Sequence, residues 1–145
     1  MLGQCLCGTV RFEIIDFVPV LYQCHCSLCR KQGGSTSNTS TMVATKNFRW
    51  IAGQDVISSW TKDTGFRSDF CATCGSPVPN PVRSGTAYVW VPAGLLEDDP
   101  RLSIGVHLHT GSRAPWDAIG APGVQFESFP GAAEFLALLH LRDRG

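Results

Sequence analysis

The chain has 145 residues, of which 43% are hydrophobic and 17% charged, and its basic and acidic residues balance to a formal net charge of zero. This size and composition are typical of one compact soluble domain, so we expect residues 1–145 to form a single domain. The balanced charge gives no general attraction for nucleic acid or an anionic membrane, and no segment approaches the roughly 18 apolar residues that span a bilayer.

The N-terminal segment MLGQCLCGTV has neither the basic region nor the apolar run of a secretory signal. The chain contains seven cysteines, an odd number that cannot pair completely. Without an export signal, so many cysteines favour metal ligation or redox chemistry over a disulfide framework. We therefore expect a cytoplasmic protein that binds metal.

Most of the chain alternates apolar and polar residues with a period of two, as in half-buried strands. The pattern is clearest over Thr9–Ile14 and again over Leu102–Leu108. Val56–Trp60 and Ala87–Val91 are rich in β-branched and aromatic residues, which also predicts strands. The polar segment Gly33–Thr41 is expected to be a loop that enters a strand.

The last segment, PGAAEFLALLHLRDRG, departs from this period and predicts an amphipathic helix. Its apolar residues recur at helical spacing: Ala132, Phe135, Leu136 and Leu139. Pro130 fits a first helical turn, and Arg142 and Arg144 would complement the helix dipole at the other end. The predicted fold is therefore mainly β, with short antiparallel strands and a C-terminal helix.

The cysteines fall into three motifs: a CxC at the start, a CxCxxC in QCHCSLCRK, and a CxxC in FCATCGSP. Tight turns that aim two thiolates at one metal are typical of zinc knuckles. The natural partition joins the CxC and the CxxC into one closed site of four thiolates: Cys5, Cys7, Cys71 and Cys74. A second site of three thiolates with one open position is left, the general pattern of catalytic zinc: Cys24, Cys26 and Cys29.

Other partitions are possible, because the three-cysteine motif could take a thiolate from the CxxC or be closed by His25. In extended backbone, however, the side chain of His25 points away from a metal that Cys24 and Cys26 share. His107 and His109 fall on one face of a predicted strand. They could line a pocket, although a solvated strand face is the simpler interpretation.

In this order and at these separations, GQCLCGTVRFE, CHCSLCRKQGG, FCATCGSPV and SRAPWDAI resemble the glutathione-dependent formaldehyde-activating enzyme family, which includes centromere-protein-V-like members. The resemblance spans essentially the whole chain. It implies an Mss4-like zinc-binding fold in a single domain of this type, with two zinc ions per chain. Cys5, Cys7, Cys71 and Cys74 would hold the structural zinc. The catalytic zinc would be held by Cys24, Cys26 and Cys29.

The resemblance further implies a carbon–sulfur lyase that joins glutathione to formaldehyde, giving S-hydroxymethylglutathione. Other thiols or small aldehydes are possible substrates. The segment Val78–Pro81 replaces the bulky apolar strand start that is commoner in the family. Two prolines cannot donate to a strand ladder, so we expect an interrupted or displaced strand there.

Glutathione carries two carboxylates, so its binding site should offer cations. Arg30 and Lys31 directly follow the three-cysteine motif, and Arg113 lies in SRAPW. Each would also be ordinary as a solvated surface charge. Trp116 could wall the substrate pocket or pack in the core.

Two other classes of function compete with the enzyme. A non-enzymatic zinc module could bind a protein partner; a nucleic-acid-binding module should instead show a basic patch, which the balanced charge does not favour. A redox protein cycling the CxxC would need a βαβ context, whereas Phe70 and the breaker-rich GSPVPNP flank this motif. Iron could also replace zinc in the four-cysteine site, which would colour the protein.

Overall fold

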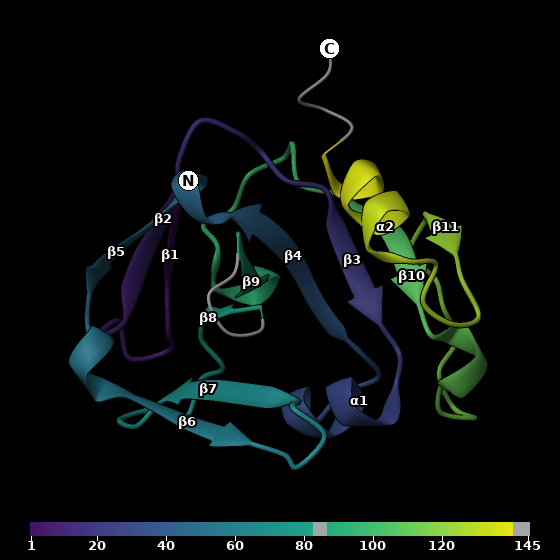
Figure 1. Cartoon of the computed structure of the whole chain (residues 1–145), viewed down its shortest axis with the longest axis horizontal. Helices are drawn as coiled ribbons and strands as arrows, with labels where there is room; N and C mark the ends of the chain where they lie inside the picture. Colours follow the sequence, from purple (N-terminus) through teal and green to yellow (C-terminus); the bar gives the residue numbers. More distant parts are fainter. Residues whose placement is uncertain (83–86, 141–145) are drawn as a thin grey trace. The chain divides into compact units, whose positions relative to one another are not determined.

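The structure is a computed structural model that describes residues 1–82 and 87–140 (Figure 1). Short strands dominate, and the mainly β class predicted from the sequence is confirmed. The strands are β1 Leu2–Gln4, β2 Arg11–Ile14, β3 Leu21–Cys24, β4 Asn38–Ala44, β5 Phe48–Ala52, β6 Ile57–Thr61, β7 Arg67–Cys71, β8 Asn80–Pro81, β9 Tyr88–Pro92, β10 Ile104–Leu108 and β11 Val124–Gln125. The α-helices are α1 Ser27–Gly33 and α2 Ala132–Leu139. The 3-10 helices are η1 Thr45–Asn47, η2 Gln54–Val56, η3 Ala93–Leu95 and η4 Thr110–Ser112.

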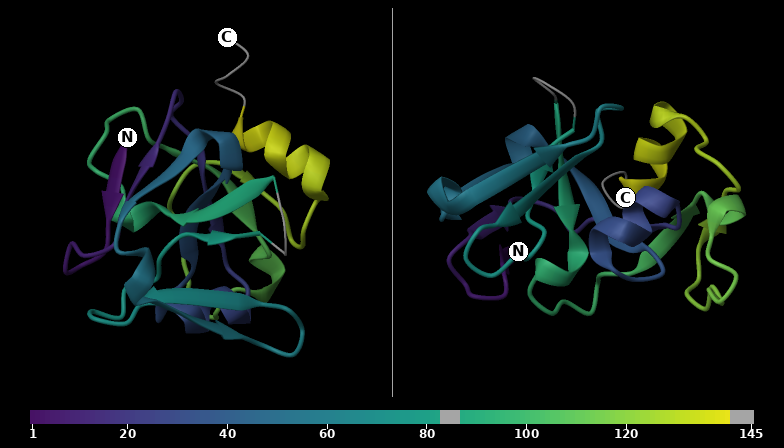
Figure 2. Two further views of the ribbon diagram at one scale, coloured as in Figure 1. Left: turned by 60° about the vertical axis from the view of Figure 1, so that its left-hand side comes forward. Right: turned by 90° about the horizontal axis from the view of Figure 1, so that it is seen from below.

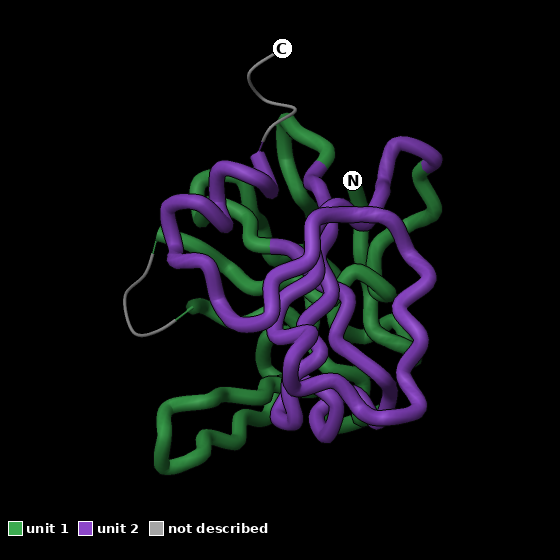
Figure 3. The backbone as a smooth tube through the Cα atoms, turned by 90° about the vertical axis from the view of Figure 1, so that its right-hand side faces the viewer, with its two compact units in different colours: residues 1–18, 42–99 green, residues 19–41, 100–145 purple. Residues whose placement is uncertain are grey.

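The chain divides into two compact units, and each is formed from two separate stretches of sequence (Figure 3). The first unit comprises Met1–Val18 and Met42–Asp99. The second comprises Pro19–Thr41 and Pro100–Gly145. The single domain expected from the chain length stays a prediction.

In the first unit, β1, β2 and β5 form an antiparallel sheet with β2 in the middle. Phe12 and Ile14 of β2 are fully buried and Arg11 is exposed, which is the alternation predicted for this strand. The strand begins at Arg11 rather than Thr9, because the preceding residues belong to the loop of the first two cysteines. Strands β6 and β7 form a separate two-stranded hairpin, which stands out in Figure 2.

The segment Val78–Pro81, with its two prolines, forms only a two-residue strand, β8. Asn80 and Pro81 pair with β9, and Val78 is fully buried, with its amide donating to the carbonyl of Asp69. Proline is tolerated here because β8 lies at the end of its sheet. The interrupted strand expected from the two prolines is therefore confirmed.

In the second unit the strand order is β11–β10–β3–β4. Strand β10 runs parallel to both β3 and β11, so the pairings are mixed rather than all antiparallel. Val106, His107 and Leu108 are buried in succession, as is usual for parallel strands covered on both faces. The solvated face expected for His107 and His109 is therefore wrong: His107 is fully buried, and His109 follows the strand with a positive φ of 55°.

Helix α2 confirms the predicted C-terminal helix, although it begins at Ala132, after Pro130. Its buried side chains are Phe135 and Leu139, and the ring of Phe135 meets the ring of Tyr22 edge-on at a centroid distance of 4.8 Å. The predicted role of Arg142 and Arg144 lies outside the described residues. Among residues 1–82 and 87–140, no helix has the length and apolar character needed to cross a membrane.

One glycine holds the first cysteine loop against the end of β5. Gly53 has a φ of 85°, and a Cβ on it would lie 2.3 Å from the carbonyl oxygen of Thr9. Gly65 has a similar φ of 93° but open space around it. A substitution at Gly65 therefore tests backbone strain alone, whereas one at Gly53 tests backbone strain together with the close approach of Thr9.

We expect Gly53→Ala to lower the free energy of unfolding by about 3 kcal/mol and Gly65→Ala by about 1 kcal/mol. Both variants incur the left-handed backbone penalty, but only the first also forces Thr9 away. Urea unfolding of the two variants beside the parent protein measures the difference. Equal losses would show that the close approach at Gly53 does not constrain the fold.

Candidate functional site

Four cysteine sulfurs of the first unit meet at one point. Cys5 and Cys7 lie in the turn between β1 and β2, while Cys71 ends β7 and Cys74 lies in the turn that follows. All four sulfurs lie within 4.8 Å of one another. Gly75, with a φ of 80°, closes the second turn by donating its amide to the Cys71 carbonyl at 2.7 Å. The sequence thus brings together the CxC and the CxxC as predicted.

The sulfur separations fit a tetrahedral metal. Four sulfurs bound at about 2.3 Å to one zinc ion lie roughly 3.8 Å from one another. The sulfur of Cys7 lies 3.6 Å from that of Cys5 and 3.9 Å from that of Cys71. Burial raises the pKa of the Cys5 thiol when no metal is bound, and the amide of Val10, which donates to its sulfur at 3.3 Å, partly offsets this. This four-cysteine cluster therefore has the donor set of a closed structural zinc site.

The other three sulfurs gather in the second unit where β3 passes into α1. Cys24 ends β3, Cys26 is the N-cap of α1, and Cys29 lies in its first turn. The sulfurs lie within 4.8 Å of one another, with 3.5 Å between Cys24 and Cys26. The predicted alternatives are not observed, because each cluster of sulfurs lies inside one unit and His25 is in neither.

Helix α1 was not predicted from the sequence. It explains how the CxCxxC spacing brings the three sulfurs together. The Cys26 sulfur accepts the amide of Cys29 at 3.4 Å, and the amide of Arg30 donates to the Cys26 carbonyl. One helical turn therefore carries Cys29 back toward Cys26. Cys24 is buried while Cys26 and Cys29 are partly exposed, so solvent reaches the cluster from the helix side.

Without a metal, the three sulfurs share protons unequally. Hydrogen bonds from the Cys24 and Cys29 thiols hold the pKa of Cys26 far below its usual range. The contact with Cys26 raises the pKa of the Cys24 thiol. The contacts with Cys24 and Cys26 raise the pKa of the Cys29 thiol. The metal-free cluster thus favours one thiolate between two thiols. A soft divalent cation would hold all three as thiolates, and three thiolates leave one tetrahedral position for another ligand.

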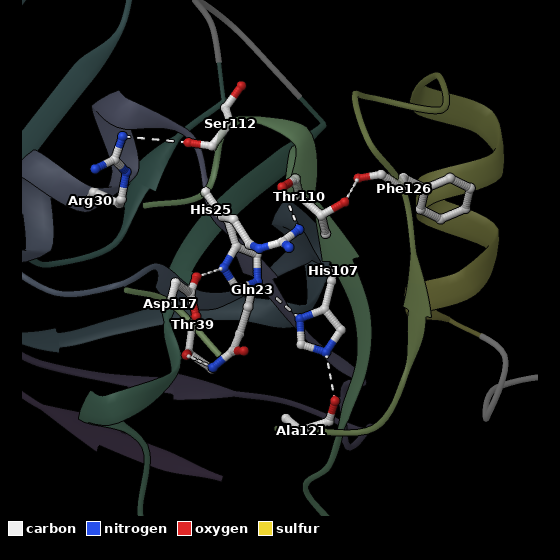
Figure 4. A network of polar contacts seen from close by, with 11 residues as sticks. Gln23, His25, Arg30, Thr39, His107, Thr110, Ser112, Asp117, Ala121 and Phe126 are labelled. Atoms are coloured by element: carbon white, nitrogen blue, oxygen red, sulfur yellow. Dashed lines mark hydrogen bonds and ion pairs between the residues drawn. The ribbon is translucent and has the colours of Figure 1, made fainter. Parts of the chain in front are cut away.

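His25 lies between two of these cysteines, but its ring points elsewhere, as the extended backbone predicts (Figure 4). Its Nδ1 lies 2.7 Å from Oδ2 of Asp117, and its Nε2 lies 3.0 Å from Nδ1 of His107. All three residues are buried. Sequence reasoning missed this network, because its members lie 92 and 82 positions from His25. The only sequence signal was the presence of Asp117 inside the SRAPWDAI motif.

Two of the predicted cationic residues meet the same turn, η4. Arg30 donates from Nη2 to the carbonyl of Ser112 at 3.4 Å, and Arg113 donates from Nη1 to the carbonyl of Thr110 at 3.3 Å. Within the described part of the chain, neither guanidinium has a carboxylate within 4.0 Å. Lys31 is exposed on α1.

Trp116 is 69% exposed, so it is not a core residue. It lies one position before Asp117, in the turn that the amide of Asp117 closes on the carbonyl of Ala114. Its role in a substrate pocket stays a prediction.

An open hollow of about 820 Å³ lies in the first unit beside Cys5. Apolar side chains on its wall include Leu2, Leu6 and Ile51. It contains none of the three-cysteine cluster; of its lining residues, Cys5 belongs to the four-cysteine cluster and the hydroxyl of Ser76 accepts the amide of Leu6. The three-cysteine cluster, not this hollow, is therefore the candidate catalytic site.

Comparison with known proteins agrees with this geometry. A family model described as glutathione-dependent formaldehyde-activating enzyme matches residues 1–112, which include all seven cysteines. A crystal structure of a Rhodobacter sphaeroides protein is similar with a TM-score of 0.56 and 27% sequence identity, over 70% of this chain and 93% of that one. Trp116 and Asp117 lie beyond the residues that the family model matches, so that match is shorter than the resemblance seen in the motifs.

Proposed function

The chain belongs to the family of glutathione-dependent formaldehyde-activating enzymes, and we propose that it is a zinc-dependent carbon–sulfur lyase. Its reaction joins a thiol, glutathione or a related one, to formaldehyde or another small aldehyde. The observation that carries the proposal is the incomplete donor set of Cys24, Cys26 and Cys29, in a chain whose other four cysteines form a complete set.

A free thiol has a pKa of roughly 8.5 and is mostly protonated at neutral pH. A zinc ion held by the three-cysteine cluster would lower the pKa of a thiol that binds at its fourth position. Cys24, Cys26 and Cys29 are all strong donors, which weakens Lewis acidity toward a carbonyl oxygen. A soft thiol ligand therefore suits these three residues better than an aldehyde does. The partial exposure of Cys26 and Cys29 leaves the approach to this position open.

The reaction balances without an oxidant or reductant. An electron pair of the thiol sulfur forms the new bond to the carbonyl carbon. The carbonyl π electrons move to oxygen, which takes up the proton that the thiol has lost. The product is an S-hydroxymethyl thioether, and the reverse reaction breaks the same carbon–sulfur bond.

Arg30, Lys31 and Arg113 would bind the carboxylates of glutathione. The guanidinium groups of Arg30 and Arg113 contact carbonyls of η4 without a carboxylate partner among residues 1–82 and 87–140, so both can accept an anionic ligand. Trp116 would offer its exposed ring to the peptide backbone of the substrate.

We expect Cys26→Ser and Cys74→Ser to fail in different ways. Cys26→Ser should lose one of two zinc equivalents and all catalysed turnover, yet keep its fold. Cys74→Ser should lose stability, because the energy of binding a structural zinc ion is folding energy. Metal analysis, thermal unfolding and exchange spectroscopy of glutathione and its formaldehyde adduct measure the three properties.

The uncatalysed exchange rate must be subtracted, since thiols add to formaldehyde unaided. Ser27→Ala, an exposed change on α1 between two of the ligands, is the control and should keep both metals and full turnover. Equal loss of stability in both cysteine variants, or catalysed turnover in Cys26→Ser, would contradict the division into structural and catalytic sites. A parent protein with one zinc ion and no turnover would favour the non-enzymatic module.

Removing Arg30 or Arg113 should weaken glutathione binding without slowing the chemistry. We expect Arg30→Ala and Arg113→Ala to raise KM for glutathione roughly five- to tenfold with kcat little changed, as for the loss of about 1 kcal/mol from an exposed ion pair. The KM for 2-mercaptoethanol, which has no carboxylate, should not change. Lys62→Ala, which removes an exposed cation of the first unit, is the control. An equal rise in KM for both thiols would exclude carboxylate recognition.

A further inference from the structure

A buried chain of polar groups in the second unit includes His25, which lies between Cys24 and Cys26 in the sequence (Figure 4). It runs from Asp117 through His25 to His107 and ends at the carbonyl oxygens of Ala121 and Pro122. His25 is 1% exposed, His107 is fully buried and Asp117 is 9% exposed. None of these groups takes part in the reaction proposed above.

The contacts assign the hydrogens along this chain. Nε2 of His107 lies 3.0 Å from the carbonyl oxygen of Ala121 and 3.1 Å from that of Pro122, so it must donate. In a neutral ring, Nδ1 of His107 is then an acceptor, and Nε2 of His25 is its donor. A proton between Nδ1 of His25 and Oδ2 of Asp117 completes the chain, so this pair together holds one proton more than a neutral imidazole and a carboxylate. Both ring nitrogens of His25 are thus held from opposite directions.

His25 is also held by its backbone, because its amide donates to the carbonyl of Leu108 at 3.0 Å. Leu108 and His107 are neighbours on β10, so one strand holds both the main chain and the ring. The flanking residues Cys24 and Cys26 project to the other side of the extended segment. An imidazole that cannot rotate therefore fixes the backbone from which two of the three sulfurs project.

A purely apolar residue would fill the place of His25 without the desolvation cost of a buried polar network. Such networks contribute direction, because each hydrogen bond accepts only a narrow range of geometries. At metal sites, partners outside the ligands hold the ligands in place, and their loss typically weakens metal binding ten- to hundredfold. Because His25 lies between Cys24 and Cys26 in the sequence, it can hold both of these ligands in place.

We propose that Asp117 is a positioning residue of the three-cysteine site, acting through His25, with His107 as the second anchor. Together they set the separation of the Cys24 and Cys26 sulfurs and so favour a tetrahedral metal. The inference rests on the proposed function, since it assumes that this cluster binds metal. The residue that does the positioning lies outside the segment that the family model matches.

Cobalt(II) titration of the full-length protein tests the proposal, because thiolate-bound cobalt gives absorption bands that report ligand geometry. The Cys26→Ser protein supplies the reference spectrum of the four-cysteine cluster. We expect Asp117→Leu to bind cobalt at the three-cysteine site at least tenfold more weakly than the parent, with shifted ligand-field bands. Cobalt affinity at the four-cysteine site should not change.

Asp117→Asn is the conservative variant, since its amide NH2 group can donate to Nδ1 of a neutral His25 ring whose Nε2 still donates to His107. It should restore cobalt affinity to within about threefold of the parent value. Thr41→Val is the matched control: it removes a buried hydrogen bond, from Thr41 Oγ1 to the Val20 carbonyl at 3.0 Å, in the same unit but away from His25. It should lower stability and leave both cobalt sites as they are.

Parent-like cobalt affinity and spectrum in Asp117→Leu would overturn the positioning role and leave the proposed function standing. An equal effect of Thr41→Val would do the same, because it would show that any loss of stability weakens the site. If Asp117→Leu does not fold, Asp117→Ser, whose hydroxyl is too short to reach Nδ1, decides by the same criteria. A parent protein that binds only one cobalt ion would overturn both the inference and the proposed function.

Discussion

The crowding of cysteine sulfurs is the constraint on which the rest of the structure depends. Within each cluster the sulfurs lie within 4.8 Å of one another. Two thiolates about 4 Å apart repel by roughly 4 kcal/mol at an effective dielectric constant near 20, so no cluster can hold all its sulfurs as anions unaided. In the three-cysteine cluster the strain appears as opposed pKa shifts, lowered for Cys26 and raised for Cys24 and Cys29. A divalent metal would remove the repulsion and so hold together the turns that carry the sulfurs.

The two clusters differ in what surrounds their sulfurs, and this difference separates structure from function. In the first unit, Cys5 and Cys71 belong to a buried apolar cluster with Val10 and Val78, and four donors leave no place for a further ligand. The three-cysteine cluster has one sulfur fewer, two partly exposed members, and a buried polar network at His25, between two of its ligands in the sequence. The same residue type therefore provides both a complete and an incomplete donor set for a tetrahedral metal.

The sequence predicted what depends on local spacing. Each cysteine motif brings its sulfurs together through one turn, so both clusters could be predicted from spacing. The strands and the terminal helix could be predicted from the period of apolar residues. Helix α1 was not, because it has no buried residue and hence no apolar stripe. The burial of His107 was also missed, since β10 is a central strand paired in parallel on both edges, and the segments that cover its faces are distant in the sequence. The partnership of His25 with Asp117 joins residues 92 positions apart, and no pattern within one sequence reveals such a pair.

The central claim is that the fourth position of the three-cysteine site is filled by a substrate thiol. Zinc K-edge X-ray absorption of the two-zinc protein, with and without glutathione, tests this directly. The account predicts a mean of about 3.5 sulfur ligands per zinc without glutathione, the average of four and three, and about 4 with it. A sulfur count that does not change at saturating glutathione would contradict the claim.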